Sequence, residues 1–207
     1  MSTGALPAPP SSRRPAAVPD DLIWRMSRDQ YHEMIRAGIL TDDDPVEMLE
    51  GWLIHKMPKS PLHRIVTRLM QKALEGAVPE GWYVDAQEPI TLEDSEPEPD
   101  VVIVRGDTRH YLDHHPAPQD VDLVVEVSDT TLQRDRGLKK RLYARAGIPA
   151  YWIIILPENR LEVCTDPSGP AEEPDYRHCR TVGLSDTVPL AIEGQEVVLL
   201  DVREFFP

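Results

Sequence analysis

Three separate runs of apolar, mostly β-branched residues constrain the fold of this chain more than any other feature. They are Val101–Val104, Val121–Val127 and Tyr151–Leu156. A run of this kind, with few polar interruptions, is typical of a strand that is buried on both faces at the centre of a sheet. The chain is therefore predicted to build its core on a sheet with at least three buried strands.

Three segments carry the start and stop signals of helices. They cover residues 28 to about 37, 61 to about 75, and 130 to about 146. Ser27 and Gln30 form a capping box before the first, and Ser60-Pro61 supplies an N-cap and a first-turn proline for the second. Apolar residues in the second segment repeat at i, i+3, i+4 and i+7, which makes it the strongest helix prediction. Gly147 ends the third segment.

Shorter patterns predict additional strands on both sides of the central runs. Glu50-Gly51 indicates the turn of a hairpin whose first arm carries Glu47. Trp82–Gln87 and Pro89–Leu92 indicate one or two further strands. Four more short strands are predicted at Leu161–Cys164, Arg177–Val182, Val188–Ile192 and Val197–Leu200. Their spacing favours an antiparallel extension of the same sheet over a second domain.

The length and composition favour one domain behind a disordered tail. Residues 1–20 hold five prolines among Ala and Ser, a composition that cannot bury enough apolar surface to offset the entropy of ordering, so the domain is predicted at residues 21–207. No apolar run approaches the roughly 20 residues needed to cross a bilayer, which predicts no membrane span. Only Cys164 and Cys179 are present, which favours reduced thiols and a cytoplasmic location.

The formal net charge of −14 opposes non-specific binding to nucleic acid, but the basic residues are concentrated in two stretches. Residues 51–74 contain no Asp or Glu, and residues 134–145 contain only one acid, Asp135. The basic residues in these stretches are Lys56, Lys59, Arg64, Arg68, Lys72, Arg134, Arg136, Lys139, Lys140, Arg141 and Arg145. Two solvated helix faces would explain the pattern equally well.

Two acids occupy the ends of predicted strands. Asp100 opens the strand at residues 101–104, and Glu126 lies near the end of the strand at residues 121–127. Carboxylates are the ligands that Mg²⁺ and Mn²⁺ prefer, and a nearby lysine such as Lys139 would complete a phosphodiester-cleaving site. Plain structural roles remain open: a turn for Asp100, a solvated strand end for Glu126, and an i, i+4 pair between Asp135 and Lys139.

A competing metal site is the segment Arg109–His115, where His110 and His114 stand four residues apart with Asp113 nearby. These are residue types that bind zinc. The segment ends in prolines and lacks helical periodicity, which favours a solvated loop.

Four stretches carry a resemblance to a known family. They are VEMLEGWLIHKMPKSPLHRIV (46–66), EPDVVIV (98–104), DLVVEVSDTTLQRDRGLKKRLYARAGI (122–148) and PAYWII (149–154). They resemble the Uma-two family of predicted bacterial restriction endonucleases, a branch of the PD-(D/E)XK nuclease superfamily, from about residue 24 to the C-terminus. The resemblance implies an α/β restriction-endonuclease-like core, with a central mixed sheet flanked by helices. It also implies Mg²⁺-dependent hydrolysis of phosphodiester bonds and often a homodimer.

The resemblance also implies which residues form the site. Asp100 matches the first metal-binding acid and Glu126 the second, while Glu47 and His63 match positions near the site. A lysine usually stands two residues after the second acid in the superfamily, but this chain has Ser128 there. The resemblance therefore places the catalytic lysine on the following helix, at Lys139, with Lys140 as the competing candidate.

These observations predict an endonuclease that hydrolyses DNA with Mg²⁺ or Mn²⁺ held by Asp100 and Glu126. The alternative is a module that keeps the nuclease fold without catalysis and binds nucleic acid or protein.

Overall fold

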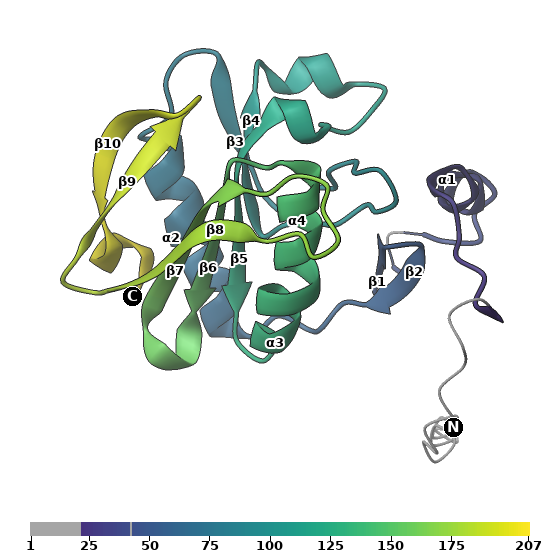
Figure 1. Ribbon diagram of the computed structural model, residues 1–207, viewed down its shortest axis with the longest axis horizontal. Coiled ribbons are helices and arrows are strands. Elements are labelled where there is room, and N and C mark those ends of the chain that lie inside the picture. The colour runs from purple at the N-terminus through teal and green to yellow at the C-terminus, as the bar shows by residue number, and fades with distance from the viewer. Residues whose placement is uncertain (1–21, 42) are drawn as a thin grey trace, which may run out of the picture.

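The computed structural model describes residues 22–41 and 43–207 of the chain (Figure 1). The tail predicted at residues 1–20 lies outside this range. The helices are α1 (Arg28–Arg36), α2 (Pro61–Glu75), α3 (Leu132–Arg134) and α4 (Lys140–Ala146). The strands are β1 (Val46–Leu49), β2 (Trp52–His55), β3 (Trp82–Asp85), β4 (Val101–Arg105), β5 (Val121–Ser128), β6 (Ala150–Ile155), β7 (Arg160–Pro167), β8 (Tyr176–Gly183), β9 (Thr187–Ile192) and β10 (Gln195–Asp201).

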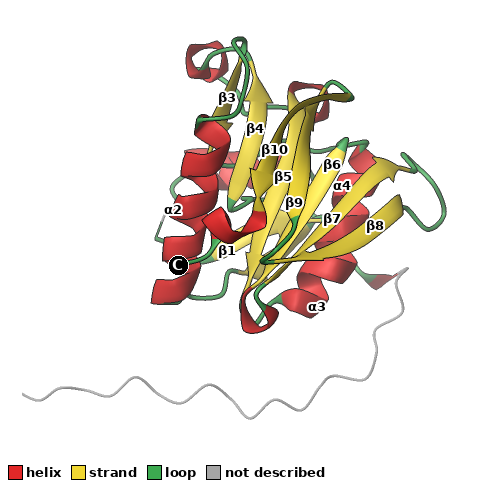
Figure 2. Cartoon of the chain, turned by 90° about the vertical axis from the view of Figure 1, so that its left-hand side faces the viewer, coloured by secondary structure: helices red, strands yellow, loops and turns green. Residues whose placement is uncertain are grey.

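The centre of the fold is a six-stranded mixed sheet in the order β3-β4-β5-β6-β7-β8 (Figure 2). Strands β5 and β6 are parallel, and every other neighbouring pair in this sheet is antiparallel. The three apolar runs form β4, β5 and β6 at the middle of the sheet, as their composition predicts. All eight residues of β5 are buried, which is the burial expected of a strand covered on both faces.

Helices cover the two faces of the sheet. Helix α2 packs on one face through Val66, Met70 and Leu74, together with the hairpin of β9 and β10. Helix α4 packs on the other face through Leu142 and Tyr143. Alternate residues along β4 and β5 point to these two layers, because side chains alternate across a strand. The predicted α/β class is confirmed.

The predicted hairpin forms β1 and β2, and it carries Glu47 toward the sheet. Glu50 and Gly51 have φ angles of 49° and 75°, which is the geometry of the type I′ turn that suits a two-residue hairpin. A Cβ atom at Gly51 would lie 2.8 Å from the carbonyl oxygen of Met26. Glycine is therefore required here both for the backbone angle and for the close approach of the preceding segment.

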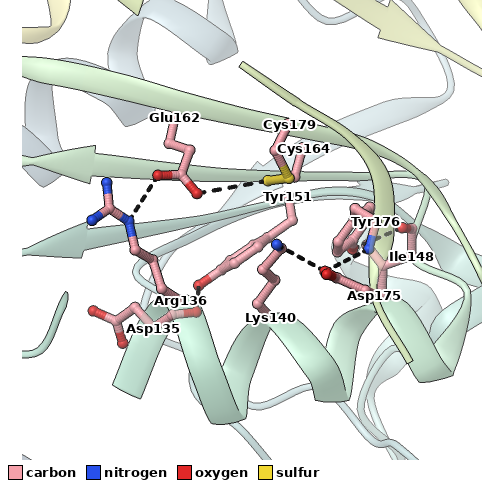
Figure 3. The surroundings of a disulfide bond; sticks show 10 residues. All are labelled: Asp135, Arg136, Lys140, Ile148, Tyr151, Glu162, Cys164, Asp175, Tyr176 and Cys179. Carbon is pink, nitrogen blue, oxygen red and sulfur yellow. Dashed lines mark hydrogen bonds and ion pairs between the residues drawn. A yellow bond between two sulfur atoms is a disulfide. The ribbon is translucent and has the colours of Figure 1, made fainter. Parts of the chain in front are cut away.

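The C-terminal strands extend the sheet as predicted, through β7 and β8, and then form the separate hairpin of β9 and β10. Cys164 of β7 and Cys179 of β8 stand directly opposite each other and are joined in a disulfide (Figure 3). The two cysteines are therefore not the reduced thiols that the sequence predicted. Cysteine number and sequence separation could not show that the strand register places the two side chains together.

Of the one or two strands predicted at residues 82–87 and 89–92, one forms, as β3. Residues 89–92 form no regular strand, because the amides of Thr91 and Leu92 donate instead to Pro116 and Ser95 outside any ladder. In the described part of the chain, no helix has the length and apolar character needed to cross a bilayer.

Candidate active site

The sheet brings the two predicted acids to one place. Val101 of β4 pairs with Val125 of β5 in antiparallel register, so the start of β4 lies beside the end of β5. Asp100 and Glu126 are the next residues beyond this pair, and each is about 5% exposed or less. The Val127 amide donates a hydrogen bond of 2.9 Å to Asp100 Oδ2, which connects the two strand ends directly.

Asp100 is held by two side chains at the start of helix α2. His63 Nε2 lies 3.1 Å from Asp100 Oδ2, and Lys59 Nζ lies 3.5 Å from Oδ1. The Ser60 hydroxyl accepts a hydrogen bond from the His63 amide, so the N-cap predicted from the sequence positions this histidine. Burial alone would raise the pKa of Asp100, but the hydrogen bonds and charges around it outweigh burial and lower the pKa. Asp100 is therefore ionised at neutral pH.

Lys139 connects Glu126 with Glu47. Its Nζ donates a hydrogen bond of 2.8 Å to Glu126 Oε1 and lies 3.6 Å from Glu47 Oε2. Burial would lower the pKa of Lys139, but the carboxylates of Glu126 and Glu47 outweigh burial and raise it. The ammonium is thus a buried, permanent cation between two acids from different strands.

A turn of π-helix, Asp135–Lys139, lies between α3 and α4 and carries this lysine. Single π turns inside α-helices occur frequently at functional sites. Lys139 forms no ion pair with Asp135 within the described residues, so the simple i, i+4 interpretation does not hold. The lysine instead faces the sheet.

Lys140 points elsewhere. Its Nζ lies 2.8 Å from Asp175 Oδ1, on the side of the helix that faces the loop before β8 (Figure 3). Of the two candidate lysines, Lys139 alone lines the pocket that contains Asp100 and Glu126.

Glu126 is the most perturbed acid of the cluster. Burial raises the pKa of Glu126 to about 8; Lys139 opposes this rise, and the charges of Asp100, Asp135 and Glu47 add to it. The Tyr143 hydroxyl donates a hydrogen bond of 2.8 Å to the same oxygen that accepts from Lys139. One oxygen of Glu126 is therefore held by the protein, while Oε2 accepts no hydrogen bond from the described residues.

Glu47 reaches the cluster from β1. It is 1% exposed, and its Oε2 accepts a hydrogen bond of 3.2 Å from the Glu98 amide. Arg134 Nη1 lies 3.9 Å from the other oxygen. The sequence resemblance placed Glu47 near the site, and the structure puts it within ion-pair distance of Lys139 but in no direct contact with Asp100.

The position where the superfamily has a lysine serves a different purpose here. The Ser128 hydroxyl donates a hydrogen bond of 2.9 Å to Asp135 Oδ2, and the Thr131 hydroxyl donates one of 2.6 Å to the same oxygen. Both bonds stabilise the chain between β5 and the π turn. Ser128 thus helps to position the segment that carries Lys139.

Sequence reasoning assigned no role at the site to Arg134 or Lys59, and both line the pocket. Arg134 Nε is buried without a hydrogen-bond partner among the described residues. The available signal was the basic stretch at residues 134–145, but periodicity alone does not distinguish a pocket-lining arginine from a solvated one.

The residues around this pocket suit a hard divalent cation. The cavity measures about 70 Å³, room for roughly two water molecules. Glu126 Oε2 accepts no hydrogen bond from the described residues, and Asp100 Oδ1 has only the half-exposed ammonium of Lys59 at 3.5 Å, which a cation could displace. Mg²⁺ commonly binds through one or two carboxylates and keeps several waters, and this donor set fits that preference.

The competing histidine segment does not gather ligands. His114 Nδ1 lies 2.7 Å from its neighbour Asp113, whereas His110 Nδ1 accepts from the Asp107 amide at 3.3 Å. Across the residues that the structure describes, three or more His, Cys, Asp or Glu ligand atoms meet only at Glu162, Cys164 and Cys179, where both sulfurs belong to the disulfide.

A solved structure shares this architecture. It is the crystal structure of a putative nuclease belonging to DUF820 from Anabaena variabilis ATCC 29413, with a TM-score of 0.65 and 15% sequence identity. The similarity covers 87% of this chain and 97% of that chain, and at this identity it shows the fold alone. No curated protein matches this chain.

A protein-family model matches most of the chain and so shows its family. The family model Uma2, described as putative restriction endonuclease, matches residues 28–203. This range includes the sheet, α2, the π turn and every residue of the cluster described above. The resemblance seen in the four sequence stretches is thereby confirmed, and the chain belongs to the Uma2 family of putative restriction endonucleases.

Proposed function

We propose that this protein is a metal-dependent endonuclease that hydrolyses phosphodiester bonds in DNA. The observation that carries the proposal is the convergence of Asp100, Glu126 and Lys139 on one small pocket, from three elements far apart in the sequence. Two buried carboxylates beside a buried ammonium match the requirements of phosphodiester hydrolysis. Membership in the Uma2 family supports nuclease activity in general.

In this proposal Asp100 and Glu126 hold Mg²⁺ or Mn²⁺ through their carboxylate oxygens. When bound, the cation neutralises charge on the scissile phosphate and lowers the pKa of a water ligand. His63 acts as a positioning residue, because its Nε2 fixes the orientation of the Asp100 carboxylate. Glu47 positions Lys139 in the same manner, from the opposite side of the ammonium.

Lys139 is proposed as the electrostatic catalyst. Its ammonium stabilises the negative charge that develops on the phosphoryl oxygens as the water oxygen bonds to phosphorus and the bond to the leaving oxygen breaks. The proton lost by the attacking water is balanced by the proton that the leaving oxygen gains. The raised pKa of Lys139 keeps the residue charged, so it acts by electrostatics and not as a general base.

The alternative function is that of a module that keeps this fold without catalysis and binds nucleic acid or protein. The absence of a lysine at position 128 favours it, and the location of Lys139 beside Glu126 opposes it. A homodimer and a cytoplasmic location also remain predictions.

Removing divalent metal should abolish cleavage of supercoiled plasmid, and adding Mg²⁺ or Mn²⁺ in excess over EDTA should restore it. Asp100→Asn should reduce metal-supported cleavage by about 10³-fold, because the neutral amide binds a divalent cation poorly. The measurement is conversion of supercoiled DNA to nicked and linear forms over time, resolved by gel electrophoresis.

The matched control is Asp175→Asn, an exposed aspartate that pairs with Lys140 outside the pocket. Cleavage that persists in EDTA, or that Asp100→Asn leaves unchanged, would contradict the proposed function. DNA binding without any cleavage would favour the non-catalytic alternative.

Metal affinity should increase with pH. A proton on Glu126 competes with the cation, and the pKa of this residue is raised to about 8, so Mn²⁺ should bind up to about tenfold more tightly per pH unit between pH 6 and 8. Asp100 is ionised throughout this range and adds no dependence. Isothermal titration of Mn²⁺ into the protein at several pH values measures the slope, and a constant dissociation constant would show that no proton on Glu126 competes with the cation in this range.

A further inference from the structure

Helix α2 presents a row of basic side chains on its exposed side. Arg64, Arg68 and Lys72 follow one another at four-residue spacing, so they lie on the same face of the helix, and all three are exposed. None of the three side chains forms an ion pair with any described residue. Lys59 precedes the same helix and extends the row toward Asp100, which it approaches to 3.5 Å.

This row borders an open groove of about 1370 Å³. The groove lies between α2 and residues 85–87, at the end of β3. Two acids also line it, Glu75 and Asp85. Each accepts a hydrogen bond from a neutral amide, Gln71 at 3.0 Å and the Ala86 backbone at 2.9 Å, and neither forms an ion pair with a described residue of the row.

The groove adjoins the candidate active site. Lys59 and Ser60 line both the groove and the small pocket that contains Asp100 and Glu126. An elongated anion lying in the groove would therefore reach the two acids at its end.

A plain solvated face explains the row poorly. Like charges at i, i+4 destabilise a helix by a few tenths of a kcal/mol per pair, and α2 contains two such pairs in succession. The chain carries 36 acidic residues against 22 basic ones, so acidic partners are plentiful, yet the row has none. A phosphate backbone would supply the missing counter-charge.

We propose that the basic row of α2 binds the sugar–phosphate backbone of duplex DNA beside the bond that is cleaved, and so places the scissile phosphate over Asp100 and Glu126. The inference rests on the proposed function and specifies how the substrate lies. Eight residues of helix span about 12 Å, and each strand of B-DNA carries a phosphate per roughly 3.4 Å of axis, so the three cations cover three to four phosphates.

The composition of the groove favours a duplex over a single strand. Single strands are usually bound by aromatic side chains on which bases stack. The described residues that line the groove include no aromatic side chain. Contacts to phosphate alone are the pattern of backbone binding to a double helix.

The test compares two double variants of equal charge in a DNA-binding assay without metal. Arg64→Gln/Arg68→Gln removes two cations of the row. Arg160→Gln/Arg180→Gln removes two exposed arginines on β7 and β8, at the sheet edge far from α2, which packs near β3 (Figure 2). Neither control arginine forms an ion pair within the described residues.

Binding of a fluorescent 20-base-pair duplex is followed by anisotropy in EDTA across a range of salt concentrations. The α2 variant should bind roughly tenfold more weakly, and its slope of log K against log salt should shrink by about 2, because each phosphate contact contributes about 0.9. The control variant should match the wild type in both its affinity and its salt dependence.

The inference would be overturned if both double variants lost the same amount of affinity for the duplex. It would also be overturned if the α2 variant bound the duplex as tightly as the wild type does. Tighter binding of a single strand of equal length, dependent on the same arginines, would also overturn the duplex assignment. Because the assay contains no metal, a failure of catalysis does not affect it. A protein that binds through α2 but never cleaves would contradict only the proposed nuclease activity.

Discussion

Replacing Lys139 with alanine should lower the rate of metal-supported DNA cleavage by about 10²–10³-fold, whereas replacing its neighbour Lys140 should leave the rate within about twofold of the wild type. The two lysines are adjacent and chemically identical, so the pair isolates location as the only variable. Lys139 Nζ contacts Glu126, and Lys140 Nζ contacts Asp175 away from the pocket. Single-turnover cleavage of a short duplex at saturating protein measures the difference.

Stability must be separated from catalysis in this comparison. Removing one partner of a buried ion pair typically costs about 3–5 kcal/mol, and Lys139→Ala leaves the buried Glu47 without its nearer cation and Glu126 without one hydrogen-bond donor. Lys139→Met keeps the aliphatic packing of the stem and serves as a second variant, with both assayed well below their unfolding temperatures. Equal rates for folded Lys139→Met and wild type would eliminate Lys139 as the electrostatic catalyst.

Glu126→Gln should reduce cleavage by about 10³-fold, the equivalent of roughly 4 kcal/mol of transition-state stabilisation. The amide has nearly the same shape as the carboxyl group, so it should keep the hydrogen bond that Tyr143 donates. What it loses is the charge that binds the cation. The cleavage rate and the affinity for Mn²⁺ should therefore fall together, with little change in the circular dichroism spectrum.

The same variant should change how the stability of the metal-free protein depends on pH. The pKa of Glu126 is raised from 4.5 to about 8 in the folded chain, so folding favours the protonated form. This contribution to stability is complete below pH 4.5 and is lost as the pH rises to about 8. Between these values the free energy of unfolding of the wild type should fall relative to Glu126→Gln, by at most about 1.4 kcal/mol per pH unit.

Urea unfolding of both proteins in EDTA at pH 5.5, 7 and 8.5 measures this difference. The other titrating groups are common to the two proteins and largely cancel. A difference that does not vary with pH would show that Glu126 remains ionised in the folded chain, and the pH dependence expected for metal binding would then be lost as well.

The elements with strong local signals were predictable from the sequence. The apolar runs of β4, β5 and β6 could be recognised as buried strands, because a strand covered on both faces has almost no polar residues. Helix α2 was predictable to its ends, since Ser60 caps it and Pro61 begins it. Of the one or two strands predicted at residues 82–92 only β3 forms, because an apolar alternation of four residues at 89–92 does not determine which backbone groups will pair.

The site was only partly predictable. Strand ends indicated Asp100 and Glu126, and the family resemblance added Glu47, His63 and Lys139. Helical periodicity could not choose between Lys139 and Lys140, because the π turn at Asp135–Lys139 departs from the 3.6-residue period on which such an assignment depends. The pairing of Cys164 with Cys179 depended in the same way on a strand register that the sequence did not specify.

The sequence by itself determined the buried strands, the principal helix, the family and the two acids, because each of these depends on residues close together in the chain. Only the tertiary structure decided that Lys139 contacts Glu126 whereas Lys140 contacts Asp175, that Glu47 approaches from a separate hairpin, and that the groove beside the basic row of α2 shares Lys59 and Ser60 with the pocket of Asp100 and Glu126. These depend on antiparallel register and on packing between elements up to about 90 residues apart, and such long-range contacts leave no local pattern to read.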